Sequence, residues 1–183
     1  MASSPSDAPA VPLGVAVLTI SDTRGPDNDG SGHYLAAQAA AAGHRVVDRA
    51  IVCDDIHMIR ARLSAWLVDP QVEVIVTTGG TGLAARDCTP EAVRALFDRE
   101  VPGFGELFRM LSYQEINTSA LQSRALAGIA NDRLVVCLPG STAACRTAWE
   151  RILYSQLDGG NTQCNFSQLL QRVRADGELA AVP

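Results

Sequence analysis

The chain has 183 residues, of which 47% are hydrophobic, and a formal net charge of −5. This charge leaves no cationic surface for a phosphate backbone, which argues against nucleic acid and anionic membranes as partners. All fifteen basic residues are arginine, which excludes a lysine nucleophile, a pyridoxal Schiff base and the lysine of a Walker A loop.

The two ends of the chain differ in composition from the rest. Residues 1–12 are rich in Ala, Ser and Pro and lack the basic start and apolar run of a signal peptide, so they predict a disordered tail. Residues 13–174 are expected to form one domain, and residues 175–183 a C-terminal tail. Five cysteines without a Cys-x-x-Cys pair, and no apolar run near eighteen residues, predict a cytoplasmic protein without a membrane span.

Short β-branched runs alternate with helical patterns along the first half of the chain. Residues 13–20, 46–52 and 72–77 predict strands, and residues 31–42 and 56–67 predict the helices between them. Such alternation is typical of a parallel sheet that is covered on both faces.

The second half begins with a helix-start signal at Thr89-Pro90-Glu91, in which Thr89 is the expected N-cap. Pro102-Gly103 is expected to break that helix before another at residues 104–113. Residues 125–129 and 133–138 predict a hairpin, followed by helices at 141–157 and 166–174. The predicted fold is therefore α/β, with three layers, a mostly parallel sheet, helices on both faces and a hairpin edge.

Small and polar residues follow each parallel strand, where open α/β sheets bind their ligands. We expect these residues to line one crevice. They are Ser21, Asp22, Asp54, Asp55, Thr78, Gly79, Gly80, Thr81, Gly82, Pro139, Gly140 and Ser141.

The glycines at 79, 80 and 82 could bring backbone N–H groups close to a phosphate. Gly140-Ser141 offers a second anion site, although it could equally be a plain helix start. Gly80-Thr81-Gly82-Leu83-Ala84-Ala85 also satisfies a dinucleotide pattern, so an NAD(P) oxidoreductase is an alternative. The helix signals come too late for that motif, at Thr89, which favours a phosphate loop.

Asp54 and Asp87 are the candidate acids of this crevice. Two carboxylates beside a polyphosphate suggest Mg²⁺, which binds through one or two carboxylates, phosphate oxygens and water. Asp54 could instead cap the helix that follows it. Asp87 has no such role, because Thr89 is the expected cap.

Four segments of the chain, some of them already described, together resemble the molybdenum cofactor biosynthesis family, also known as the MoaB/MogA molybdopterin-binding family. Four others look like its MoaB branch. The first set is Thr77-Thr78-Gly79-Gly80-Thr81-Gly82, Arg86-Asp87-Cys88-Thr89-Pro90-Glu91-Ala92, Pro102-Gly103-Phe104-Gly105-Glu106 and Leu138-Pro139-Gly140-Ser141. The second set is Ser31-Gly32-His33-Tyr34-Leu35, Phe97-Asp98-Arg99-Glu100, Phe108-Arg109-Met110-Leu111-Ser112 and Cys145-Arg146-Thr147-Ala148-Trp149-Glu150.

The resemblance implies a homo-oligomer, a trimer or hexamer, that binds molybdopterin and a nucleotide. Related enzymes adenylylate molybdopterin with Mg-ATP and release pyrophosphate. By similarity, residues 79–82 would hold phosphate, and Asp54 and Asp87 would position Mg²⁺ and the α-phosphate. Ser21, Asp22 and Ser141 would line the pterin and nucleotide pockets, and Glu106 matches a family motif. The alternative within the resemblance is a non-catalytic molybdopterin-binding or assembly protein.

Overall fold

The computed structural model describes residues 11–161 and 164–180, and within them six strands form one sheet in the order β2-β1-β3-β6-β5-β4. β1 pairs in parallel with β2 and β3, and β3 with β6, whereas β6, β5 and β4 pair antiparallel. The strands are β1 (Gly14–Ile20), β2 (Arg45–Val52), β3 (Val74–Thr78), β4 (Arg99–Glu100), β5 (Leu126–Ala130) and β6 (Arg133–Leu138). The prediction of a mostly parallel sheet with a hairpin edge is confirmed.

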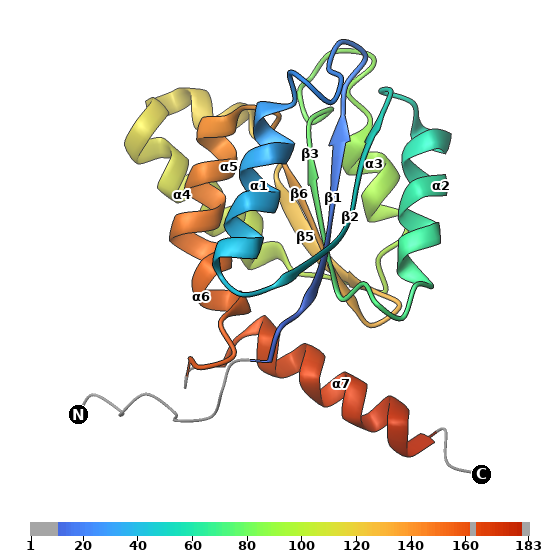
Figure 1. Cartoon of the computed structure of the whole chain (residues 1–183). Helices are drawn as coiled ribbons and strands as arrows, with labels where there is room; N and C mark the ends of the chain where they lie inside the picture. The colour runs from blue at the N-terminus through green and yellow to red at the C-terminus, as the bar shows by residue number, and fades with distance from the viewer. Residues whose placement is uncertain (1–10, 162–163, 181–183) are drawn as a thin grey trace.

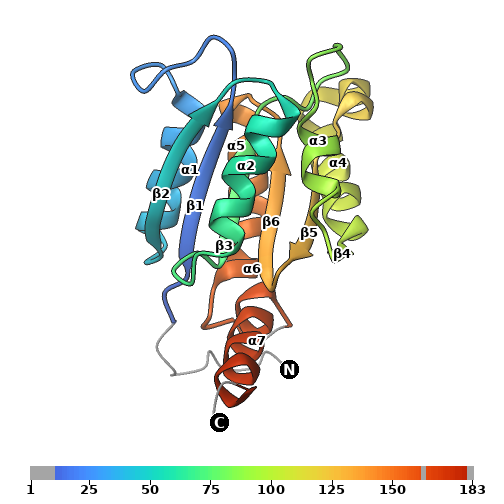
Figure 2. The same cartoon turned by 90° about the vertical axis from the view of Figure 1, so that its right-hand side faces the viewer.

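Helices cover both faces of this sheet (Figures 1 and 2). α1, α4, α5 and α6 lie on one side, and α2 and α3 lie on the other (Figure 1). The helices are α1 (Gly30–Ala41), α2 (Ile56–Leu67), α3 (Thr89–Arg94), α4 (Pro102–Ile116), α5 (Thr142–Ala148), α6 (Tyr154–Leu157) and α7 (Phe166–Ala180), with the 3-10 helix η1 (Asn117–Gln122) and the π-helix η2 (Trp149–Leu153). Among the described residues, none of the helices has the length and apolar character needed to span a membrane.

Alternate residues of the central strands pack into two separate cores. Because successive side chains of a strand point to opposite faces, Val15 and Val17 join one core and Ala16 and Leu18 join the other. β1 and β3 are buried along their whole length, as expected for parallel strands covered on both faces.

The carboxyl ends of the parallel strands meet at one edge. Thr78 of β3 pairs with Thr19 of β1 and with Leu138 of β6, and Ile20 pairs with Val52 of β2. The chain leaves β1 through α1 to β2 on one side, while β3 lies on its other side. This change of direction is where open α/β sheets form ligand crevices.

Several predicted element boundaries are wrong. α3 begins at Thr89 with Cys88 in the N-cap position and no side-chain cap, so Thr89 is not the cap. Pro102 opens α4 instead of preceding it, since proline suits the first turn. The helix predicted for residues 141–157 starts at Thr142 and contains a π-helical turn, and α7 continues six residues past Arg174. The predicted tail at residues 1–12 lies mostly outside the described residues.

Candidate functional site

A cavity of about 330 Å³ opens at the carboxyl ends of β1, β3 and β6. The structure brings together there most of the residues that the sequence singled out. The lining residues are Ile20, Ser21, Thr23, Arg24, Asp54, Gly79, Gly80, Thr81, Gly82, Asp87 and Gly140.

Three glycines of this wall pack closely against neighbouring atoms, and two of them have a backbone conformation that other residues rarely adopt. Gly79 and Gly80 have φ angles of +105° and +60°, in the region that favours glycine. A Cβ on Gly79 would lie 2.1 Å from the carbonyl oxygen of Ile20, and one on Gly82 would lie 2.6 Å from Asp87 Oδ2. These glycines therefore let the loop pack closely against the end of β1 and against the Asp87 carboxylate, and they also allow the turn.

The two adjacent aspartates after β2 have different roles. Asp55 caps α2, because its Oδ1 accepts hydrogen bonds from the N–H groups of His57 and Met58 at 2.9 and 3.0 Å. Asp54 makes no such cap. Its Oδ1 is buried and, among the described residues, has no hydrogen-bond partner. The structure thus removes the capping alternative for Asp54.

Asp54 lies in a field of negative charge. Burial raises the pKa of the Asp54 carboxyl, and the Asp22 and Asp87 carboxylates raise it further, against a smaller lowering by Arg86. Two of these carboxylates, Asp54 and Asp87, line the cavity, and a bound cation would offset their repulsion.

Asp22 does not line the cavity but is hydrogen-bonded to Asp54, which does. Its carboxylate pairs with Arg86 at 2.9 Å and accepts a hydrogen bond from the backbone N–H of Asp54 at 3.2 Å. Asp87, on the loop after β3, accepts a hydrogen bond from the Ala84 N–H through Oδ2 at 2.8 Å. Residues 80–85 form this loop and start no helix, so the context required by a dinucleotide motif is missing.

Three predicted site residues do not line the cavity but support the segments that do: Thr78, Pro139 and Ser141. The buried Thr78 hydroxyl donates to the Pro139 carbonyl at 3.0 Å and contacts Cys145 Sγ at 3.3 Å, so it joins the ends of β3 and β6. Ser141 Oγ accepts from the Ala144 N–H at 3.1 Å and caps α5. The ordinary helix-start interpretation of Pro139-Gly140-Ser141 therefore holds for the Ser141 side chain, while Gly140 lines the cavity.

Glu106 does not join this group. It lines a separate cavity of about 120 Å³ on the hairpin side of the sheet, with Arg94, Glu100 and Arg109. Its position on α4, rather than at the end of a parallel strand, explains the separation.

Arg24 also lies at this site, although it was not predicted from the sequence. Its Nη1 donates to Ser31 Oγ at 2.6 Å and its Nη2 to the Gly140 carbonyl at 2.9 Å. It lines both the 330 Å³ cavity and a larger adjoining cavity of about 610 Å³, which His33 and Arg49 also line. Its place just after β1, beside Ser21 and Asp22, was the available signal.

Asp54 and Asp87 are the residues in this cavity that could hold Mg²⁺. Within the described part of the chain, no group of three or more His, Cys, Asp or Glu side chains is arranged to bind a metal ion. A magnesium ion here would take its other ligands from substrate phosphate and water, as Mg²⁺ usually does. The partnerless Asp54 Oδ1 fits such a ligand.

Known proteins resemble the chain along most of its length. A family model described as a probable molybdopterin binding domain matches residues 16–159. Molybdenum cofactor biosynthesis protein B of Escherichia coli (strain K12) is 55% identical over 162 residues, which cover 88% of this chain and 95% of that protein.

Solved structures agree with these sequence matches. A crystal structure of molybdenum cofactor biosynthesis protein B has a TM-score of 0.82 and 37% identity, covering 94% of this chain and 99% of its own. The molybdopterin biosynthesis enzyme MoaB from Thermus thermophilus has a TM-score of 0.70 and 38% identity, covering 77% and 89%.

Proposed function

The chain belongs to the molybdenum cofactor biosynthesis protein B (MoaB) family, and from that premise we propose that it adenylylates molybdopterin with Mg-ATP. The observation that carries the proposal is the meeting of the glycine loop, Asp54 and Asp87 in one cavity. The cavity combines backbone groups suited to phosphate with carboxylates suited to a divalent cation.

The proposed reaction is a nucleotidyl transfer. A phosphate oxygen of molybdopterin attacks the α-phosphorus of ATP, a new P–O–P bond forms, and pyrophosphate leaves with the bonding electron pair. The nucleophile is already anionic near neutral pH, so no strong general base is needed. The site must instead place the two phosphates in line and offset their charge.

The chain's own residues supply the placement. Residues 79–82 present backbone to the phosphates, and the aspartates Asp54 and Asp87 would hold Mg²⁺. Magnesium, when bound, would neutralise charge on the reacting phosphates. Arg24 adds a cation between the two adjoining cavities, which offer room for both the pterin and the nucleotide, with Ser21 on their shared border.

A non-catalytic molybdopterin-binding or assembly protein is the second candidate. It needs only the family's molybdopterin-binding domain, which matches residues 16–159. The two candidates differ in turnover. Pyrophosphate release from Mg-ATP that requires both molybdopterin and Mg²⁺ would support the transferase, whereas tight molybdopterin binding without release would support the binding protein.

We also propose that the chain forms homo-oligomers, either trimers or hexamers, in the cytoplasm. α4 and η1 expose five large apolar side chains, which is unusual for a surface without a partner. They are Leu107, Met110, Tyr113, Ile116 and Leu121. All five cysteines are free thiols, which suits a reducing compartment.

A further inference from the structure

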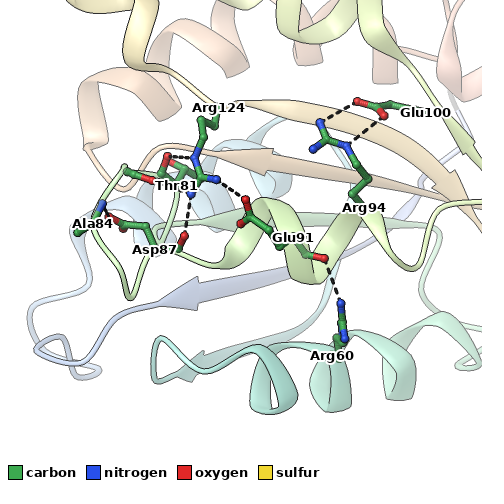
Figure 3. A network of polar contacts seen from close by, with 9 residues as sticks. Arg60, Thr81, Ala84, Asp87, Glu91, Arg94, Glu100 and Arg124 are labelled. Carbon is green, nitrogen blue, oxygen red and sulfur yellow. Dashed lines mark hydrogen bonds and ion pairs between the residues drawn. The ribbon is translucent and has the colours of Figure 1, made fainter.

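Arg124, between η1 and β5, reaches across to the loop that follows β3 (Figure 3). Its Nε donates to the Thr81 carbonyl at 3.1 Å, and its Nη2 donates to the carbonyls of Gly82 at 2.6 Å and Asp87 at 2.7 Å. One guanidinium thus bonds both ends of the loop that contains Asp87.

The remaining contacts of Arg124 leave it little freedom to bind a substrate. Its Nη1 pairs with the Glu91 carboxylate in the first turn of α3. Arg60 of α2 donates to the Glu91 carbonyl at 3.2 Å and so ties the same turn to a second helix (Figure 3). Four of the five guanidinium N–H donors are used within the protein. A role in phosphate binding is therefore less suited to Arg124 than a role in holding the backbone.

On the β1 and β2 side, the loop is held by Arg86, whose guanidinium pairs with the Asp22 carboxylate at 2.9 Å and donates to the Asp54 carbonyl at 3.4 Å. The other contacts are local. Asp87 and Ala84 exchange two hydrogen bonds, and the Thr89 N–H donates to the Gly80 carbonyl at 3.0 Å. Glycines at 80 and 82 add backbone freedom. Arg124 is the side chain that fixes the loop to the hairpin side of the sheet.

We propose that Arg124 is a positioning residue, which clamps residues 81–87 so that Asp87 and the glycine loop face the reacting phosphates. This inference rests on the proposed function. Displacements of about 1 Å in a group that positions a reactant can lower the rate about 100-fold, so a clamp on this loop would matter for turnover.

The Arg124→Lys variant distinguishes the geometry of the clamp from an effect of charge alone. Arg124→Lys keeps the positive charge, but an ammonium group cannot reproduce the planar fork that contacts three carbonyls. Arg124→Gln removes the charge as well. Arg94→Gln is the matched control. Arg94 lies on α3, the same helix as Glu91, and makes two hydrogen bonds to Glu100 and none to the loop (Figure 3).

The first measurement is hydrogen–deuterium exchange of the full-length protein in peptides that cover residues 80–88. It does not depend on activity. We expect Arg124→Lys and Arg124→Gln to exchange at least about tenfold faster there than wild type, while Arg94→Gln matches wild type in this loop. Unchanged exchange in both Arg124 variants would overturn the inference. If Arg124→Gln does not fold, Arg124→Lys and Glu91→Gln, which loosens the clamp from its other side, decide the result.

The second measurement is pyrophosphate release with Mg-ATP and molybdopterin. We expect Arg124→Lys to lower kcat about tenfold or more and to raise the half-saturating Mg²⁺ concentration, because Asp87 is displaced. Wild-type kcat and Mg²⁺ dependence in Arg124→Lys would overturn the positioning role. An inactive wild type would refute the proposed function, and the exchange result would still test the clamp.

Discussion

Asp54 Oδ1 and Thr89 Oγ1 both lie within 2.6 Å of the point where a side chain on Gly80 would place its Cβ. Both oxygens are buried, and neither has a hydrogen-bond partner among the described residues. Buried polar atoms without partners are costly and cluster at functional sites. Gly80 therefore lets the loop backbone pack directly against two buried oxygens, where a side chain would collide with both.

A side chain at residue 80 should destabilise the fold. We predict that Gly80→Ala lowers the free energy of unfolding by about 1 to 3 kcal/mol, because of its positive φ and the contacts with Asp54 and Thr89. Gly43→Ala is the control, since Gly43 has a φ of +86° with no atom within 4 Å of its Cβ position. Urea denaturation should show a smaller loss for Gly43→Ala. Equal losses would mean that contacts of a residue-80 side chain with Asp54 and Thr89 add nothing to the cost of the positive φ.

Neutralising Asp54 should stabilise the fold at neutral pH. The pKa of Asp54 is raised above its ordinary value of 3.8 by burial and by Asp22 and Asp87. The folded state thus holds this proton more tightly than the unfolded chain. Its stabilising effect is present below the unfolded pKa and is lost as pH rises through the folded pKa. Asp54→Asn should therefore melt higher than wild type at pH 7, with the difference shrinking toward pH 3. A lower melting temperature at pH 7 would contradict this.

The cap of α2 should depend on Asp55, and the start of α3 should not depend on the Thr89 hydroxyl. Asp55→Ala removes two hydrogen bonds to α2 and should cost about 1 kcal/mol. Thr89→Val removes a buried hydroxyl without a partner and should change stability by less than about 0.5 kcal/mol. Chemical denaturation of both variants tests the pair, and a loss for Thr89→Val as large as that for Asp55→Ala would contradict the prediction.

The sequence was sufficient for the fold and for most of the cavity. β-branched runs and their order predicted the sheet, and the residues after each strand predicted Asp54, Asp87 and the glycine loop at one edge. These features are local in the chain, and parallel pairing converts them into a shared site.

What the sequence could not provide depends on contacts between distant segments. Arg124 lies 37 residues beyond Asp87 and reaches the loop only because β5 pairs with β6. β4 has two residues, too few for a periodic pattern. Thr89 has the residue type of a cap, but it is the first residue of α3, and its hydroxyl lies against the Gly80 backbone instead.

The exposed apolar residues of α4 test the proposed self-association. Met110 and Ile116 are 57% and 51% exposed in the single chain. We predict that Met110→Glu with Ile116→Glu shifts the protein toward the monomer in light scattering coupled to size-exclusion chromatography, because unpaired charges in an interface are costly. Met58→Glu, on the exposed face of α2, is the control. A wild-type monomer, or an unchanged oligomer in the double variant, would contradict the proposal.

The most direct test of the proposed transferase is pyrophosphate release from Mg-ATP in the presence of molybdopterin, measured for wild type, Asp87→Asn and Asp55→Asn. Asn can still cap a helix, so Asp55→Asn should retain the wild-type rate. Asp87→Asn removes a carboxylate from the cavity and should lower kcat about 100-fold or more. No release by the wild type, or an undiminished rate in Asp87→Asn, would contradict the account.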